Sequence, residues 1–220
     1  LSTAIIILGI AVVLVFVASP KYGQFAWMIF LGCAFMGIFL AMESYRLERL
    51  QIWRHPENYE KGYQTLQGLY AIGSGGLFGK GFGSSIQKLG FVPEAQNDMI
   101  FSIICEELGL VGASFVLLLF LILIWRFFVI ASHAPDLEGA LIASGAMAHM
   151  MIQVILNIAV VTNTIPNTGI TLPFISYGGT SVVFLLVEMG LVLSVSKNGS
   201  YCEEAVSYTH LRAHETRGNL

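Results

Sequence analysis

The sequence predicts an all-α protein that crosses a membrane several times. Hydrophobic residues make up 55% of the 220-residue chain and charged residues only 11%, and the mean hydropathy is +0.74. Soluble domains carry about 25% charged residues, so an ordinary soluble domain is excluded. The apolar residues also gather into long runs, and a run of about 20 can cross the hydrocarbon core as a helix.

Several apolar runs are long enough to cross a bilayer. The first two are separated by a short turn, which predicts a helical hairpin. The third is longer than a bilayer requires, so we expect its first turns to project into a cavity or the interface. Glu188 lies inside the last run, where an ionisable side chain is costly unless it has a polar partner or faces a cavity. In order, the runs are 1–19, 24–42, 99–131, 140–161 and 182–195.

A polar connection at about 43–98 joins the second and third runs. It is far longer than the usual connection of about 4–6 residues, and such loops are commonly functional or disordered. Aromatic and aliphatic side chains recur along it, so we expect it to fold against the membrane domain. The glycine-rich stretch 73–83 predicts tight turns. Before it, residues 62–72 have helical spacing, with an apolar face made by Tyr63, Leu66, Leu69 and Tyr70.

The uncharged segment 162–181 cannot be a regular helix, because prolines and glycines interrupt it repeatedly. Irregular backbone at membrane depth is tolerated only where protein or a water-filled cavity satisfies its amides. We therefore predict a re-entrant or cavity-lining loop. In the preceding run, His149, Gln153 and Asn157 recur every four residues and so share one helix face. Hydrogen bonding between helices is favoured over catalysis for these three residues.

The two ends of the chain carry separate predictions. The chain starts with a leucine inside an apolar run, so we expect it to begin within a larger membrane domain. Residues 199–220 are polar and lack periodicity, and the words VSYTHLRAHET resemble an adapter-derived tail. The predicted organisation is one membrane domain over 1–198 and a non-native, disordered tail over 199–220.

Asp98 stands where the polar loop gives way to an apolar run. An ionisable group at such a boundary is a functional candidate, whereas a plain structural role would be to cap the following helix. The two roles can coexist. At about 100° per residue, Glu106 falls about 80° from Asp98 on a helix, and Glu107 about opposite. Glu106 can therefore share a cavity with Asp98, while Glu107 is expected to find a packing partner.

Lys80 and Lys88 precede these acids in the loop, so acid and base meet at the membrane surface. This combination suits a substrate with an anionic head and a lipid tail. A nucleotide site is not indicated, because Lys80 is followed by Gly81 and no Walker A pattern surrounds it. Three isolated cysteines indicate neither a disulfide framework nor a zinc site. With a net charge of −3 and no basic block, nucleic acid is not expected as a partner.

Two stretches are long and specific: GYQTLQGLYAIGSGGLFGKGFGSSIQKLGFVPEAQNDMIFSIICEELGLVG at 62–112 and TGITLPFISYGGTS at 168–181. They resemble the signature blocks of the SEDS family (shape, elongation, division and sporulation), which contains the FtsW, RodA and SpoVE proteins. The words QKLGFVPEAQND and ITLPFISYGG resemble the FtsW and SpoVE branch more than RodA. Family members have about ten membrane spans, so we expect about five helices of a ten-helix bundle here.

The resemblance implies a peptidoglycan glycosyltransferase that polymerises lipid II, an undecaprenyl-pyrophosphate-linked disaccharide peptide, in the bacterial cytoplasmic membrane. The acid of the family's P-E-x-x-x-D block is catalytic and falls on Asp98, which we expect to act as a general base. Lys88 and Lys80 are candidates to assist the departing pyrophosphate. Glu94 can orient a lysine or the acceptor sugar, and Glu106 is a further substrate-binding candidate. A divalent cation is left open as a cofactor, although the sequence shows no closed ligand set.

The family places the long loop outside the cell, whereas a count of lysines and arginines would place it in the cytoplasm; we follow the family. It also implies a class B penicillin-binding protein, a single-span transpeptidase, and division proteins as partners. Two alternatives fit the same hydropathy. One is a flippase for the lipid-linked precursor, and the other is a non-enzymatic division scaffold. Only the enzyme would make glycan strands.

Overall fold

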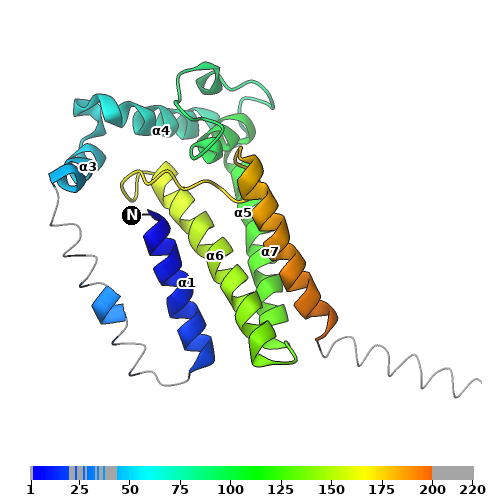
Figure 1. Cartoon of the computed structure of the whole chain (residues 1–220). Helices are drawn as coiled ribbons and strands as arrows, with labels where there is room; N and C mark the ends of the chain where they lie inside the picture. The colour runs from blue at the N-terminus through cyan, green and yellow to red at the C-terminus, as the bar shows by residue number, and fades with distance from the viewer. Residues whose placement is uncertain are drawn as a thin grey trace, which may run out of the picture.

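The computed structural model describes residues 2–19 and 44–199, together with positions 23, 27, 29–32, 34 and 37. The predicted second run, 24–42, and the predicted tail therefore lie almost entirely outside the described residues. Short 3₁₀ turns occur at Pro56–Asn58, Glu60–Gly62 and Gln87–Leu89. The α-helices are α1 (Ser2–Ala18), α3 (Ser44–Arg54), α4 (Tyr63–Gly75), α5 (Ile100–Ser132), α6 (Leu137–Val161) and α7 (Gly179–Lys197) (Figure 1).

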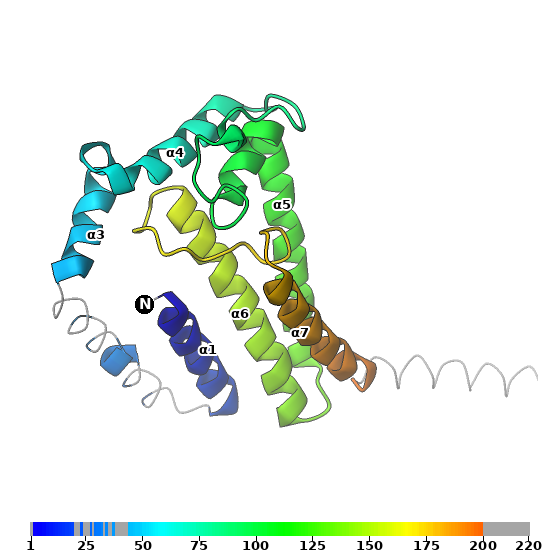
Figure 2. The ribbon, with the colours of Figure 1, turned by 45° about the horizontal axis from the view of Figure 1, so that its top comes forward.

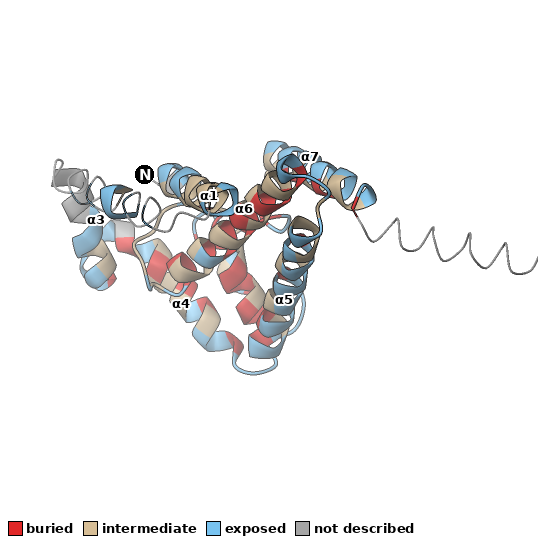
Figure 3. Ribbon diagram, turned by 90° about the horizontal axis from the view of Figure 1, so that it is seen from below, coloured by how far each residue is buried: buried red, intermediate tan, exposed pale blue. Residues whose placement is uncertain are grey.

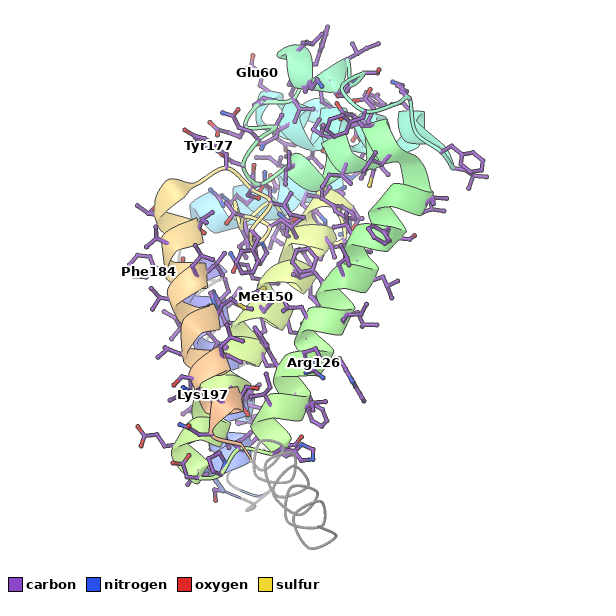
Figure 4. All side chains as sticks on the ribbon, turned by 90° about the vertical axis from the view of Figure 1, so that its right-hand side faces the viewer. Glu60, Arg126, Met150, Tyr177, Phe184 and Lys197 are labelled. Atoms are coloured by element: carbon purple, nitrogen blue, oxygen red, sulfur yellow. The ribbon has the colours of Figure 1, made fainter. Side chains whose placement is uncertain are left out.

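Helices α5, α6 and α7 are each long and apolar enough to cross a membrane, and α1 is a shorter apolar helix. These helices lie side by side, with α6 in contact with α1, α5 and α7 (Figure 1). α6 is the most buried of the three long spans, whereas α5 and α7 expose much of their apolar surface (Figure 3). Phe184 on α7 points away from the bundle, and Met150 on α6 is buried within it (Figure 4). The predicted all-α membrane fold is confirmed.

The long polar loop folds over one end of this bundle. Helices α3 and α4 lie across the end opposite to Lys197 (Figures 1 and 4). The helix predicted over 62–72 is present as α4, which continues three residues further, to Gly75. The expectation that this loop is folded is therefore confirmed over the part that the structure describes.

The apolar face predicted for α4 is not the face that the helix buries. Tyr63 and Tyr70 are exposed. The small side chains are buried instead, because α4 packs closely against the start of α5: a Cβ atom at Gly75 would lie 1.9 Å from the carbonyl oxygen of Cys105. The buried residues of α4 are Thr65, Gly68, Ala71 and Gly75.

Helix α5 is interrupted at Gly109, where φ is 65° and ψ is −169°. In a regular helix the N–H groups of Leu110 and Val111 would donate to the carbonyls four residues earlier. Here they donate to the carbonyls of Gly76 (3.0 Å) and Leu77 (3.1 Å). The glycine-rich loop thus inserts into the break, and its close approach leaves room only for glycine at 109, where a Cβ atom would lie 2.5 Å from the oxygen of Leu77.

The segment between α6 and α7 is irregular, as predicted. It crosses from the end of α6 to the start of α7 beneath α4 (Figure 2). Asn163 (φ 54°) and Phe174 (φ 62°) take left-handed backbone conformations within it. We call residues 162–178 the crossing segment below.

Candidate active site

Asp98 lies in a polar hollow of about 320 Å³ between helices α3 and α4 of the long polar loop and the crossing segment. Helix α5 begins at Ile100 with Met99 as its N-cap and no side-chain capping hydrogen bond, so the alternative in which Asp98 is the cap of this helix is not observed. Asp98 itself is only 8% exposed. The hollow is lined by Arg49, Ile52, Trp53, Gln64, Thr65, Asp98, Asn163, Asn167, Thr168 and Gly169.

A chain of amides holds the Asp98 carboxylate. The Gln64 side chain donates from Nε2 to Asp98 Oδ1 at 3.2 Å. Asn167 in turn donates from Nδ2 to Gln64 Oε1 at 3.3 Å. Because Gln64 is on α4 and Asn167 is in the crossing segment, three separate parts of the chain fix the position of the carboxylate.

The crossing segment is tied to the backbone just before α5. Ser176 donates from Oγ to the carbonyl of Asn97 at 2.6 Å, and the Tyr177 N–H donates to the carbonyl of Gln96 at 2.8 Å. On the other side of the hollow, Trp53 of α3 donates from Nε1 to the carbonyl of Asn163 at 2.9 Å. The irregular backbone thus forms one wall of the hollow, as a cavity-lining loop should.

Asn157 on α6 holds the backbone of Asp98 in place. Its side chain is fully buried, and Nδ2 donates to the carbonyls of Asp98 (2.8 Å) and Ile170 (2.7 Å). Both hydrogens of the amide are used. Of the three polar residues predicted to form hydrogen bonds between helices, only His149 does so, with Glu188 of α7. Gln153 and Asn157 bond instead to irregular segments, and Asn157 holds the backbone of the candidate acid.

We expect Asn157→Leu to lower kcat at least tenfold with little change in KM. The substitution removes both hydrogen bonds, and a displacement of about 1 Å at a catalytic group can cost about 10²-fold in rate. The matched control is Thr162→Val at the end of α6, which removes only the bonds from the hydroxyl of Thr162 to the carbonyls of Ile158 (2.8 Å) and Ala159 (3.4 Å) and to Thr164 (3.0 Å). Steady-state kinetics of both variants check this prediction, and equal losses in the two would contradict it.

Burial raises the pKa of the Asp98 carboxyl above its ordinary value of 3.8, and the charge of Glu94 raises it further. Hydrogen bonds from backbone N–H groups and Gln64 act in the opposite direction and only partly compensate. A carboxyl whose pKa is higher in the folded state stabilises the fold below its unfolded pKa, and this contribution is lost as the pH rises through the folded value. The ionised Asp98 therefore serves function rather than stability at neutral pH.

This shift predicts the acid side of the pH profile. A base must be ionised to accept a proton, so the rate should rise with pH through the raised pKa of Asp98. The expected result is an acid limb in kcat/KM with its midpoint above 3.8. A profile in which activity is already full at or below that pH would contradict the prediction.

The other predicted site residues lie outside the hollow of Asp98. Lys80 Nζ is 2.7 Å from Glu106 Oε1, and Lys88 Nζ is 2.6 Å from Glu107 Oε1. Glu106, fully buried, also accepts from Ser85 Oγ at 2.5 Å. The predicted shared cavity of Glu106 and Asp98 is not formed, because the inserted glycine-rich loop provides Glu106 with its own partners.

Glu94 is exposed and has a left-handed backbone conformation (φ 53°). Its carboxylate accepts a hydrogen bond from Asn97 Nδ2. Glu94 and Lys88 both line a separate depression beside the start of α5. The structure brings these two predicted residues together, but in a different place from Asp98.

Arg49, on α3, was not singled out from the sequence, yet it lines the hollow of Asp98. Its guanidinium donates from one terminal nitrogen to the carbonyl of Asn167 at 3.3 Å. Arg49 and Asp98 are far apart in the sequence, so no local sequence pattern could link them. Among the residues that the structure describes, no three His, Cys, Asp or Glu side chains gather as a metal site.

A second, larger cavity of about 790 Å³ lies between α1, α6 and α7. It is mainly apolar, and its polar residues include His149 and Glu188, whose Nδ1 and Oε2 atoms are 2.9 Å apart. Both predictions for Glu188, a polar partner and a cavity, are thus confirmed. Gly169 lines this cavity and also the hollow of Asp98, so the two spaces adjoin.

Comparison with known proteins agrees with this geometry. A family model for cell cycle proteins, named for FtsW, RodA and SpoVE, matches residues 1–201. Stage V sporulation protein E of Bacillus subtilis (strain 168) is 44% identical over 204 residues, covering 91% of this chain and 56% of that protein. A probable peptidoglycan glycosyltransferase FtsW of Thioalkalivibrio sulfidiphilus (strain HL-EbGR7) is 39% identical over 199 residues, covering 88% and 50%.

A solved structure is also similar. It belongs to a peptidoglycan synthase complex described as coordinating polymerization and crosslinking, with a TM-score of 0.71 and 27% identity, covering 91% of this chain and 56% of that chain. The chain spans about half the length of the curated relatives it matches. These findings, with the apolar helices, show that the chain is a multi-pass bacterial membrane protein and belongs to the FtsW, RodA and SpoVE family of cell cycle proteins.

Proposed function

We propose that this chain is part of a peptidoglycan glycosyltransferase that polymerises lipid II, with Asp98 as the general base. The observation that carries the proposal is the composition of the hollow: among its lining residues, Asp98 is the one side chain that can carry a negative charge, and Arg49 is the one with a positive charge. Relatives named as probable peptidoglycan glycosyltransferases support the reaction class.

The reaction joins the 4-hydroxyl of one sugar to the anomeric carbon of another and releases a lipid pyrophosphate. Inversion requires the hydroxyl to attack from the face opposite the leaving group. The Asp98 carboxylate accepts the proton of that hydroxyl as the new glycosidic bond forms. Gln64 donates a hydrogen bond to Oδ1 of this carboxylate and so helps to hold it in place for the proton transfer.

The leaving pyrophosphate carries negative charge and needs cationic help. Arg49 is the best-placed candidate among the described residues, because its planar guanidinium suits phosphate oxygens and shares the hollow with Asp98. Lys80 and Lys88 were proposed for this task from the sequence. Their pairing with Glu106 and Glu107 favours a structural role for them, in holding the loop.

The two adjoining cavities match the two halves of the substrate. The polar hollow suits a sugar and pyrophosphate head, and the apolar cavity between α1, α6 and α7 suits part of a lipid tail. A class B penicillin-binding protein is the proposed partner, in line with the similarity to a peptidoglycan synthase complex. Such a partner would crosslink the strands that this enzyme makes.

Product analysis tests the function. The full-length protein is purified, incubated with labelled lipid II, and its products are separated by length. The proposal expects glycan strands. Movement of label across a liposome membrane without chain lengthening would indicate the flippase, and neither result would indicate the scaffold.

A further inference from the structure

The glycine-rich loop carries large apolar side chains that the protein does not cover. Leu77, Phe78 and Phe82 are 61%, 81% and 89% exposed. We call these three residues the loop tip. In water, such a cluster within six positions would be unfavourable, because each side chain keeps most of its apolar surface hydrated.

The backbone places the loop tip beside a membrane-spanning helix. Val111 of α5 donates its N–H to the carbonyl of Leu77. The chain carries no charged residue between Glu107 and Arg126. At 1.5 Å per residue such a run is about 27 Å long, close to the roughly 30 Å of the hydrocarbon core. Val111 therefore lies near the upper boundary of the core, and Leu77 lies at the same level.

The exposed surface of the loop tip continues that of α5. Leu110 and Val111 are 60% and 57% exposed at the point where the loop inserts. They begin the exposed apolar surface of α5, a helix long and apolar enough to cross a membrane.

Two features of the loop favour its placement near lipid. First, three consecutive N–H groups between the tip residues are hydrogen-bonded within the protein: that of Gly79 donates to the carbonyl of Gly75 (2.8 Å), that of Lys80 to the carbonyl of Glu106 (2.9 Å) and that of Gly81 to the carbonyl of Glu107 (3.0 Å). Second, the charge of Lys80, which lies between Phe78 and Phe82 in the sequence, is paired with Glu106. Unsatisfied amides or a lone charge would oppose insertion at this depth.

We propose that the loop tip, Leu77, Phe78 and Phe82, inserts into the lipid bilayer beside α5 and so anchors the glycine-rich loop. The anchor would hold helices α3 and α4 of the long polar loop at a constant height above the membrane. This inference concerns a lipid contact and does not depend on the proposed reaction.

Spin labelling tests the anchor in the full-length protein, reconstituted into phosphatidylglycerol and phosphatidylethanolamine vesicles. A nitroxide is attached at Phe82→Cys after all other cysteines of the full-length protein are replaced by alanine. Collision with oxygen, which partitions into lipid, is compared with collision with a water-soluble nickel complex. Phe115→Cys, on the exposed face of α5, is the lipid reference, and Asn58→Cys, on an exposed turn, is the water reference.

The expected result is a label at 82 that resembles the one at 115 and lies about 5–10 Å below the headgroup surface, as interfacial segments do. A label that resembles the one at 58 would overturn the proposal, and so would a label shielded from both reagents, because protein would then cover the tip. Phe82→Trp keeps an aromatic ring and provides a second measurement. Its added fluorescence should be quenched by brominated lipid, and absence of quenching would equally overturn the anchor.

Discussion

Asp98→Asn is expected to lower the rate of lipid II polymerisation about 10²–10⁴-fold, the usual contribution of a general base. Asparagine has nearly the same shape and can still accept a hydrogen bond from Gln64, but it cannot take up the proton of the attacking hydroxyl. The variant should remain folded. Because burial raises the pKa of Asp98, ionisation of this carboxyl opposes folding at neutral pH. The melting temperature of Asp98→Asn should therefore be equal to or above that of the wild type.

The measurement is the initial rate of glycan-strand synthesis, with thermal melting in the same detergent. Glu60→Gln is the matched control, because it neutralises an exposed acid of the same loop outside the hollow. The control should retain the wild-type rate. A folded Asp98→Asn enzyme that works near the wild-type rate would show that Asp98 is not the base.

Lys80→Met is expected to open the glycine-rich loop. The fully buried carboxylate of Glu106 would lose its cationic partner at 2.7 Å. Removing one member of a buried ion pair costs about 3–5 kcal/mol, and because Lys80 is one-third exposed we expect about 3 kcal/mol. Hydrogen exchange of the amides at 76–85 should accelerate on the order of 100-fold.

A second substitution separates charge from packing. In Lys80→Met/Glu106→Gln the buried group is neutral and can still accept from Ser85 Oγ. Most of the lost protection should return. Unchanged exchange in the single variant would contradict the role assigned to this pair, and so would a double variant that exchanges as fast as the single one.

Hydropathy was sufficient to predict α5, α6 and α7 as helices able to cross a membrane, and the irregular segment between α6 and α7. Long apolar runs have few alternatives to a helix in lipid, and the prolines and glycines of 162–181 exclude a regular helix. The sequence could not predict in the same way which face of α4 is buried. Periodicity favours burial of the large residues Tyr63 and Tyr70, but the close contact of Gly75 with α5 is a tertiary feature that selects the small face.

The candidate site was only partly predictable for a similar reason. The change from polar to apolar sequence identified Asp98, and this position is independent of how the loop folds. Arg49, Gln64 and Asn167 meet at Asp98 only because α3, α4 and the crossing segment converge there. Helical geometry alone predicted that Glu106 lies near Asp98. It could not predict that the glycine-rich loop inserts into α5 and pairs Lys80 with Glu106.

Chemical rescue of Asp98→Ala tests the central claim most directly, because it asks whether a carboxylate in this hollow removes the proton. The substitution leaves space in a hollow of about 320 Å³, and formate is a small carboxylate that can enter it. The account predicts that formate restores a measurable part of the roughly 10²–10⁴-fold loss and leaves the wild-type rate unchanged. A variant that polymerises lipid II as fast as the wild type, or an inactive folded variant that formate does not rescue at any concentration, would contradict it.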